Sequence, residues 1–393
     1  MTAVIAPPRI GVVGAGIAGS LLAWRLATAG PAGRVELLGA PAPGGGDATG
    51  VSGGLVRGFE TDPTARRLAT AGLAELLASP TLLAWSGFRQ IGSVYVIDPA
   101  DAPGLAAARA LTRGGTGPHA SAAPPGAVLT DAAVLTDAAG LADRHGWRGL
   151  PADCLGVVEP PAGHISPDAL RAGVLADLAD RGVPVRPEPV VTIRPEPGGG
   201  ATVLTGAGTH RYDAVVVAAG RWTPRLLRDS GLPTGNLRTK LVQYGVYQAG
   251  GPPPPAFVDD TTGLYGRGMA DGQVLLGVPV HHFDIDPDHP EPDHEAQTRA
   301  AELADVRLPL LRLGRLSRVV AGADCYAEPA RLRLAELPHP RIYTFTGGSG
   351  GSAKLALAAS AAAAGELAEL LGIGDAPARR AGMGPESATA GPP

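Results

Sequence analysis

Short apolar runs alternate with amphipathic stretches at the start of the chain. Residues 10–13 form an apolar run typical of a buried parallel strand, and the stretch after it carries Leu21, Leu22 and Leu26 on one helical face. A second strand-like run follows at residues 34–38. The order strand, helix, strand predicts an α/β fold with a doubly wound sheet.

A second group of strands is predicted in the middle of the chain. Residues 212–227 contain a buried strand, a turn and a helix, and they follow two strand-like segments at 190–195 and 201–206. Proline and glycine at 197–200 predict a hairpin between those two segments. A meander of this kind followed by a return strand is not typical of an NAD domain, and it favours the FAD-binding variant of the doubly wound fold.

Further elements follow from the same patterns. Residues 166–182 predict a helix that begins near Ser166 or Asp168 and ends at a glycine, and residues 87–98 predict a strand. Three more strand-like segments are expected to form a separate antiparallel sheet: 240–248, 263–269 and 273–280.

The turn after the first strand carries a dinucleotide-binding pattern. Gly14, Gly16 and Gly19 have the spacing GxGxxG, in which a tight turn and a helix N-terminus face a pyrophosphate. The surrounding strand, helix and strand favour this interpretation over a glycine-rich turn without a ligand. The acidic residue expected for the ribose hydroxyls is missing, because Gly39 occupies the end of the second strand.

Composition narrows the class of protein. The 393 residues allow two domains, the net charge is -4, and no run of Lys and Arg indicates a nucleic acid partner. The N-terminus has no signal peptide pattern, no apolar run predicts a membrane span, and two cysteines do not make a disulfide framework. A cytoplasmic protein that binds small molecules is therefore expected.

Two polar segments are assigned to no site. Residues 281–295 contain acids and histidines, but prolines interrupt them, so a solvated loop is favoured over a metal site and no metal is predicted. Residues 373–393 are predicted to be a disordered tail.

Four segments carry a family resemblance: GVVGAGIAG at 11–19, GVVEPPAGHISPDAL at 156–170, DAVVVAAGRWTP at 213–224, and the stretch from IYTFTGGSGGSAKL onward at 342–371. In this order they resemble the FAD-dependent D-amino acid oxidase superfamily, and most closely its sarcosine oxidase and glycine oxidase branch. The resemblance spans about residues 9 to 371 and is weakest between 100 and 150.

The resemblance implies an interleaved architecture. An FAD-binding, glutathione reductase-like domain is expected from residues 1–85, 155–230 and 325–372. A substrate domain of α+β type with an antiparallel sheet is expected from residues 86–154 and 231–324.

The resemblance also implies which residues contact FAD. They are Gly14, Gly16, Ile17, Ala18, Gly19, Thr49, Gly50, Ser52, Val190, Ala219, Gly220, Trp222, Cys325, Gly347, Gly348, Ser349, Gly350, Gly351 and Lys354. Cys325 falls where sarcosine oxidase-like proteins attach FAD covalently, but its flanking residues depart from that pattern. A simple buried cysteine therefore stays open beside covalent attachment.

The same resemblance implies residues for the substrate. Arg57 and Lys354 match the pair that holds a substrate carboxylate, with solvated surface charges as the alternative. A lysine that promotes reaction with oxygen is expected where Leu275 stands. Arg267 on a neighbouring strand is the candidate to replace its charge, with an ordinary exposed arginine as the alternative. His281 follows the strand where the family often places a histidine near the substrate.

Together these features predict an FAD-dependent oxidoreductase. A small amine or amino acid would lose a hydride from its alpha carbon to flavin N5 and become an imine, with oxygen as acceptor and hydrogen peroxide as product; a biosynthetic step is one setting. Three alternatives stay open: a dehydrogenase, a redox tailoring enzyme that does not use oxygen, and an inactive binding module. Gly39 and Leu275 motivate the last of these.

Overall fold

The computed structural model describes residues 7–29, 34–39, 46–113 and 133–373. Its central sheet has the order β19-β20-β13-β1-β2-β9, parallel except for the β19–β20 pair. The strands are β1 (Arg9–Val13), β2 (Arg34–Leu38), β9 (Val185–Arg186), β13 (Ala214–Val217), β19 (Arg333–Glu336) and β20 (Ile342–Thr346). The apolar runs at 10–13 and 214–217 are almost fully buried, as expected of strands covered on both faces.

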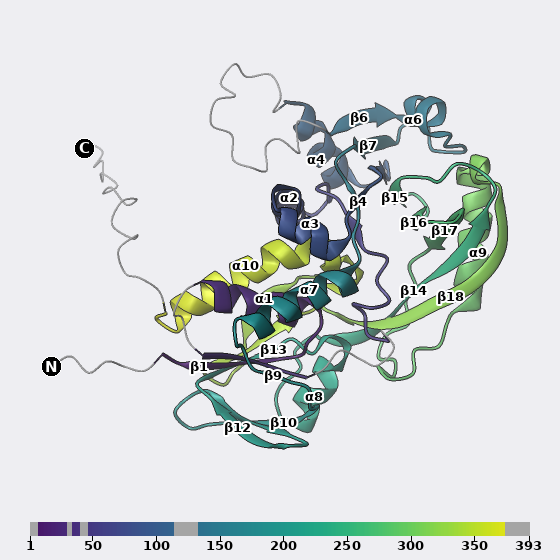
Figure 1. Cartoon of the computed structure of the whole chain (residues 1–393). Coiled ribbons are helices and arrows are strands. Elements are labelled where there is room, and N and C mark those ends of the chain that lie inside the picture. The colour runs from purple at the N-terminus through teal and green to yellow at the C-terminus, as the bar shows by residue number, and fades with distance from the viewer. Residues whose placement is uncertain (1–6, 30–33, 40–45, 114–132, 374–393) are drawn as a thin grey trace, which may run out of the picture.

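Helices cover one face of this sheet and a small antiparallel sheet covers the other (Figure 1). The helical layer contains α1 (Ile17–Thr28), α2 (Pro63–Ala78), α3 (Pro80–Ser86), α7 (Pro167–Asp180) and α10 (Ser352–Leu370). The opposite layer contains β10 (Val190–Pro195), β11 (Ala201–Thr205), β12 (Gly208–Tyr212) and α8 (Thr223–Asp229). The predicted hairpin and meander are thus present.

An eight-stranded sheet forms the second part of the molecule, in the order β18-β14-β17-β16-β15-β5-β7-β6. Its strands are β5 (Ser93–Ile97), β6 (Val134–Asp137), β7 (Leu155–Glu159), β14 (Arg238–Ala249), β15 (Ala256–Asp259), β16 (Leu264–Gly268), β17 (Gln273–Gly277) and β18 (Leu313–Tyr326). It is antiparallel except between β5 and β15. Helix α9 (His294–Arg307) packs on the outer side of this sheet, and α4 (Ala102–Arg113) and α6 (Ala138–His145) lie beside β6 and β7 (Figure 1).

Three short strands, β3 (Leu55–Val56), β8 (Gly163–His164) and β4 (Arg89–Gln90), form a small antiparallel sheet. The strand predicted at 87–98 is therefore divided into β4 and β5, because Gly92 has a φ of +72° and interrupts the extended backbone. Helix α7 begins as predicted, since the Ser166 hydroxyl accepts a hydrogen bond from the Ala169 amide.

The predicted division into domains differs from the strand pairing at one boundary. Residues 155–159 were assigned to the cofactor domain, but they form β7, which pairs with β5 and β6 in the eight-stranded sheet. This boundary was wrong by one strand, and the rest of the division stays a prediction. The predicted tail lies outside the described residues from 374 onward.

In the described ranges, no single helix is long and apolar enough to cross a membrane. The pair α2 and α3, bent by 100°, meets that criterion by length and composition only.

Candidate cofactor and substrate site

The turn between β1 and α1 has the backbone geometry that the glycine pattern predicts. Gly14 has a φ of +116°, and a Cβ on Gly14 would overlap the Ala218 carbonyl group. A Cβ on Gly19 would overlap the Gly14 carbonyl oxygen, so helix and strand meet at a distance only glycine allows. Gly16, the N-cap residue of α1, has no side chain to cap the helix, and the first amide, that of Ile17, donates to the Thr49 hydroxyl. The start of α1 otherwise faces the cavity, where an anion would be stabilised.

A cavity of about 620 Å³ begins at this turn. Of the predicted cofactor residues, it is lined by Gly14, Gly16, Ile17, Ala18, Thr49, Val190, Ala219, Gly220, Trp222, Cys325, Gly347 and Gly348. These come from the central sheet, the meander layer and the loop after β20, which are far apart in the sequence.

A second cavity, of about 430 Å³, adjoins the first and shares five lining residues with it: Ile17, Ala48, Thr49, Asp324 and Ser352. Ser52, Ser349, Gly350, Gly351 and Lys354 line it from the predicted cofactor residues. Tyr244 and Tyr265 line it from the eight-stranded sheet. Two joined cavities, one at a dinucleotide turn and one under an antiparallel sheet, fit FAD with its nucleotide in the first and its ring system toward the second.

Two predicted cofactor residues line neither cavity. Gly19 acts through packing against Gly14, as above. The Gly50 amide donates a hydrogen bond to Asp47 Oδ1 at 2.8 Å, so Gly50 shapes the loop that carries Thr49. The Thr49 hydroxyl itself accepts from the Ile17 amide at 3.0 Å, which ties this loop to the start of α1.

The end of β2 lacks the expected carboxylate. Gly39 lines the first cavity with a φ of +105°, and its amide donates to the Arg186 carbonyl oxygen at 2.7 Å. Three described carboxylates line this cavity at other positions: Asp47, Asp229 and Asp324. A nucleotide bound in this cavity would lack the usual acid at the end of the second strand.

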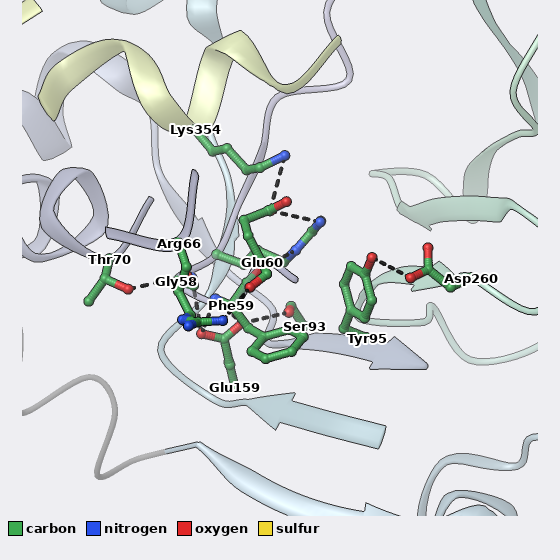
Figure 2. A network of polar contacts seen from close by, with 11 residues as sticks. Gly58, Phe59, Glu60, Arg66, Thr70, Ser93, Tyr95, Glu159, Asp260 and Lys354 are labelled. Atoms are coloured by element: carbon green, nitrogen blue, oxygen red, sulfur yellow. Dashed lines mark hydrogen bonds and ion pairs between the residues drawn. The ribbon is translucent and has the colours of Figure 1, made fainter. Parts of the chain in front are cut away.

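Arg57 and Lys354, predicted as a pair, both line the second cavity and meet at one carboxylate. Glu60 Oε1 lies 2.8 Å from Arg57 Nη2 and 3.1 Å from Lys354 Nζ. In Figure 2, Lys354 extends from α10 toward Glu60. Burial lowers the pKa of Lys354, and the Glu60 carboxylate partly offsets this. The alternative of two solvated surface charges is wrong, because the side chains of Arg57 and Lys354 are 8% and 13% exposed.

The loop that carries Arg57 and Glu60 is held by a buried carboxylate. Glu159 Oε1 accepts hydrogen bonds from the Gly58 and Phe59 amides, both at 3.0 Å (Figure 2). Burial raises the pKa of Glu159, and these two amide bonds oppose the rise. The motif that contains Glu159 therefore positions the loop.

Asp260, directly after β15, lines the second cavity. Asp260 Oδ2 accepts from the Tyr95 hydroxyl at 2.7 Å, and Tyr95 lies under the Arg57 guanidinium, 4.8 Å from its ring centroid. Burial raises the pKa of Asp260. Among the described residues, three basic side chains and two acidic ones line this cavity: Arg57, Lys240, Lys354, Asp260 and Asp324. Glu60 contacts Arg57 and Lys354 beside the cavity, and Figure 2 shows the bond between Tyr95 and Asp260.

Arg267 and His281 are not brought into the cavities. Arg267 is buried, and its guanidinium donates to the Gly53 and Gly268 carbonyl oxygens at 2.8 and 3.0 Å. The His281 side chain is exposed, although its neighbours Val278 and Val280 are buried and line the second cavity. The chain stays beside β14 here, since Lys240 and Phe283 form a bridge. His281 lines neither cavity, and its place near the substrate stays a prediction. Leu275 is fully buried and approaches Gly53, so the expected lysine position is apolar.

Cys325 lines the first cavity as a buried thiol. Burial raises its pKa to about 11, while a hydrogen bond with Thr346 opposes the rise. The neighbouring Asp324 lines both cavities and pairs in register with Lys240 of β14. Burial also raises the pKa of Asp324, to about 6, against the opposing charges of Lys240 and Arg221.

Several site residues were not predicted from the sequence: Glu60, Arg221, Lys240, Asp260 and Asp324. For Glu60 a signal was present, since it lies three residues after Arg57. Asp260 and Lys240 reach the cavity through strand pairing, which the sequence does not specify. In the described parts of the chain, no group of three or more His, Cys, Asp or Glu is arranged to hold a metal ion.

Comparisons with known proteins agree with this geometry. A family model described as FAD dependent oxidoreductase matches residues 9–367. No curated protein sequence matches the chain.

Three solved structures illustrate the likeness of fold. The L-proline dehydrogenase from P. horikoshii has a TM-score of 0.75 at 16% identity, over 92% of this chain and 94% of that protein. The glycine oxidase from Geobacillus kaustophilus has a TM-score of 0.70 at 18% identity, over 93% and 95%. The iminodiacetate oxidase from Chelativorans sp. BNC1 has a TM-score of 0.66 at 20% identity, over 91% and 94%. The predicted fold class is confirmed.

Proposed function

The chain belongs to the family of FAD-dependent oxidoreductases, and from this premise we propose that it oxidises the carbon–nitrogen bond of a small amine or amino acid to an imine. The predictions of the family and of FAD as cofactor are confirmed by the same match. The observation that carries the finer proposal is the meeting of Arg57 and Lys354 in the second cavity.

The cation pair supports a substrate with a carboxylate. A carboxylate that leaves water needs opposite charges and hydrogen bonds, and an arginine fork beside a lysine supplies both. Glu60 occupies the shared position between these cations. We therefore include a competition in the proposal: the substrate carboxylate replaces Glu60 as the partner of Arg57 and Lys354.

Asp260 completes the proposed substrate site. Its Oδ2 atom is bonded to the Tyr95 hydroxyl, which leaves Oδ1 to accept a hydrogen bond from the substrate amine. Carboxylate and amine would then be held at two points, which fixes the alpha carbon between them. When bound, FAD supplies the redox chemistry by accepting two electrons with the hydrogen of that carbon.

The proposed final acceptor is oxygen, which would yield hydrogen peroxide. A dehydrogenase is the second candidate, and two observations favour it: Leu275 is buried and apolar, and the Arg267 guanidinium is bonded to backbone carbonyl groups rather than open to the cavities. Rates in air and with an artificial electron acceptor separate the two.

We propose further that FAD is held without a covalent bond. A thiolate is the form of cysteine that reacts, and the raised pKa of Cys325 disfavours it near neutral pH. The proposed oxidation as a whole is tested by substrate kinetics: Arg57→Met should raise KM for a carboxylate substrate at least about tenfold. An unchanged KM would remove Arg57 from the site.

A further inference from the structure

Arg221 is a buried arginine without hydrogen-bond partners on two of its nitrogen atoms. It lies in the 3₁₀ turn Gly220–Trp222 directly after β13, and 6% of its surface is exposed. In the described part of the chain, Nε and Nη1 find no acceptor. The guanidinium lies over the ring of Trp222, 4.3 Å from its centroid, and this stacking fixes its plane.

The first nearby carboxylate, Asp288, is already engaged. Its Oδ1 atom accepts from Trp222 Nε1 at 2.7 Å, and its Oδ2 atom accepts from Arg225 Nη1 at 2.6 Å. Asp288 therefore attracts Arg221 through its charge without bonding to it.

Two further carboxylates act on Arg221 in the same indirect way. Asp47 is ion-paired with Arg171, and Asp324 pairs in register with Lys240. A buried guanidinium that keeps free N–H groups loses its water without replacement, which is costly. The arrangement is therefore complete only with an anionic ligand.

The position of Arg221 in the first cavity indicates which anion this is. Arg221 lines the same cavity as the start of α1, and the charges of Asp47 near Thr49 and of Asp324 near the second cavity both act on it. Arg221 therefore lies between the turn that joins β1 to α1 and the second cavity, toward which the ring system of FAD would face. The ionised part of FAD at neutral pH is its pyrophosphate, which must lie in this middle portion if the ring system faces the second cavity.

We propose that Arg221 binds the pyrophosphate of FAD opposite the α1 N-terminus. An arginine fork makes charge-assisted bonds to phosphate oxygens and needs no other partner. This contact also compensates for the missing acidic residue at the end of β2, where Gly39 offers no carboxylate to the ribose. Contacts to the phosphates, rather than to the ribose, therefore contribute most of the affinity for the nucleotide.

The test measures binding of ADP and of adenosine to the flavin-free full chain by titration calorimetry. Arg221→Met should weaken ADP binding at least about tenfold, since hydrogen bonds to charged groups contribute about 1.5–3 kcal/mol. The Kd of adenosine, which has no phosphate, should stay within about twofold of the wild-type value. Arg221→Lys keeps the charge without the planar fork of donors, so its affinity for ADP should lie between those of the wild type and Arg221→Met. Arg228→Met, an exposed arginine on the same helical segment outside the cavity, is the matched control and should bind both ligands normally.

A structural role for Arg221 predicts a different pattern. If the arginine merely supported the fold, Arg221→Met would melt at lower temperature without flavin and would weaken ADP and adenosine equally, and either result overturns the proposal. A ligand site predicts an unchanged or higher melting temperature, because an unpaired buried charge is removed. The readout is nucleotide binding, so the outcome is independent of whether an amine is the substrate.

Discussion

Lys354 Nζ lies 3.1 Å from Glu60 Oε1, and the same oxygen is 2.8 Å from Arg57 Nη2. The two cations come from opposite ends of the chain, and the internal carboxylate of Glu60 pairs with both beside the cavity where a substrate carboxylate is proposed to bind. In the proposed function, substrate binding is therefore an exchange of one carboxylate for another. Competition with Glu60 then sets how strongly the site binds a substrate carboxylate.

Removal of that internal carboxylate should strengthen binding of external ones. Glu60→Gln should lower the Kd of acetate or benzoate at least about fivefold, because about 1 kcal/mol of competing charge attraction is lost. The Kd is measured from the change in the flavin absorbance band on titration. Glu75→Gln is the matched control, since Glu75 pairs with Arg25 outside both cavities. An unchanged Kd in Glu60→Gln would mean that the carboxylate does not compete.

The attachment of FAD can be decided by acid precipitation of the purified protein. The raised pKa of the Cys325 thiol predicts that the yellow colour stays in the supernatant. Cys325→Ser should then keep its full flavin content. Flavin in the wild-type pellet that moves to the supernatant in Cys325→Ser would establish the covalent bond instead.

Whether reduced flavin passes its electrons to oxygen depends on the buried, apolar surroundings of Leu275. With oxygen alone, the wild type should form peroxide, and Leu275→Lys should raise that rate at least about tenfold, because a cation stabilises the negative charge that develops on oxygen. Leu275→Met, which keeps the apolar character, serves as the control. Fast turnover with an artificial acceptor and negligible peroxide in the wild type would identify a dehydrogenase.

Glu36 predicts a pH-dependent stability of the central sheet. Burial alone would raise its pKa, but hydrogen bonds from Arg9, Arg186 and Tyr212 lower it from 4.5 to about 2. The ionised form is thus stabilised in the folded state, so its contribution is complete above about pH 4.5 and is lost as the pH falls toward 2.

Glu36→Gln should accordingly lower the free energy of unfolding by about 2 kcal/mol at pH 7, a value reduced for the partly exposed arginines. Urea unfolding at several pH values measures this. The difference between variant and wild type should shrink between about pH 4.5 and 2. A difference that does not depend on pH would show that packing, rather than charge, is what the substitution removes.

Local patterns were sufficient to predict the backbone geometry of the turn between β1 and α1. Gly14 and Gly19 act through their own backbone and through neighbours that the strand–turn–helix unit brings together, so spacing alone predicts their role. The α7 N-terminus at Ser166 follows for the same reason, because a capping bond spans three residues.

The substrate half depends on contacts between distant segments. Asp260 joins the site through Tyr95, 165 residues away, and β7 enters the eight-stranded sheet by pairing with strands that local patterns do not specify. The sequence does not specify which side chains after β17 turn toward the cavity: Val278 and Val280 line it, whereas His281 is exposed. Such long-range pairings are decided by packing of the whole domain.

The central claim, oxidation of an amine with a carboxylate held by Arg57, is tested most directly by anaerobic reduction of the purified protein. Small amino acids, the matching amines without a carboxylate and NADPH are each mixed with it while the flavin absorbance band is followed. The account predicts bleaching by at least one amino acid, slower bleaching by its amine counterpart, and loss of that preference in Arg57→Met. Bleaching by NADPH but by no amine would contradict it and would indicate a nicotinamide-dependent enzyme.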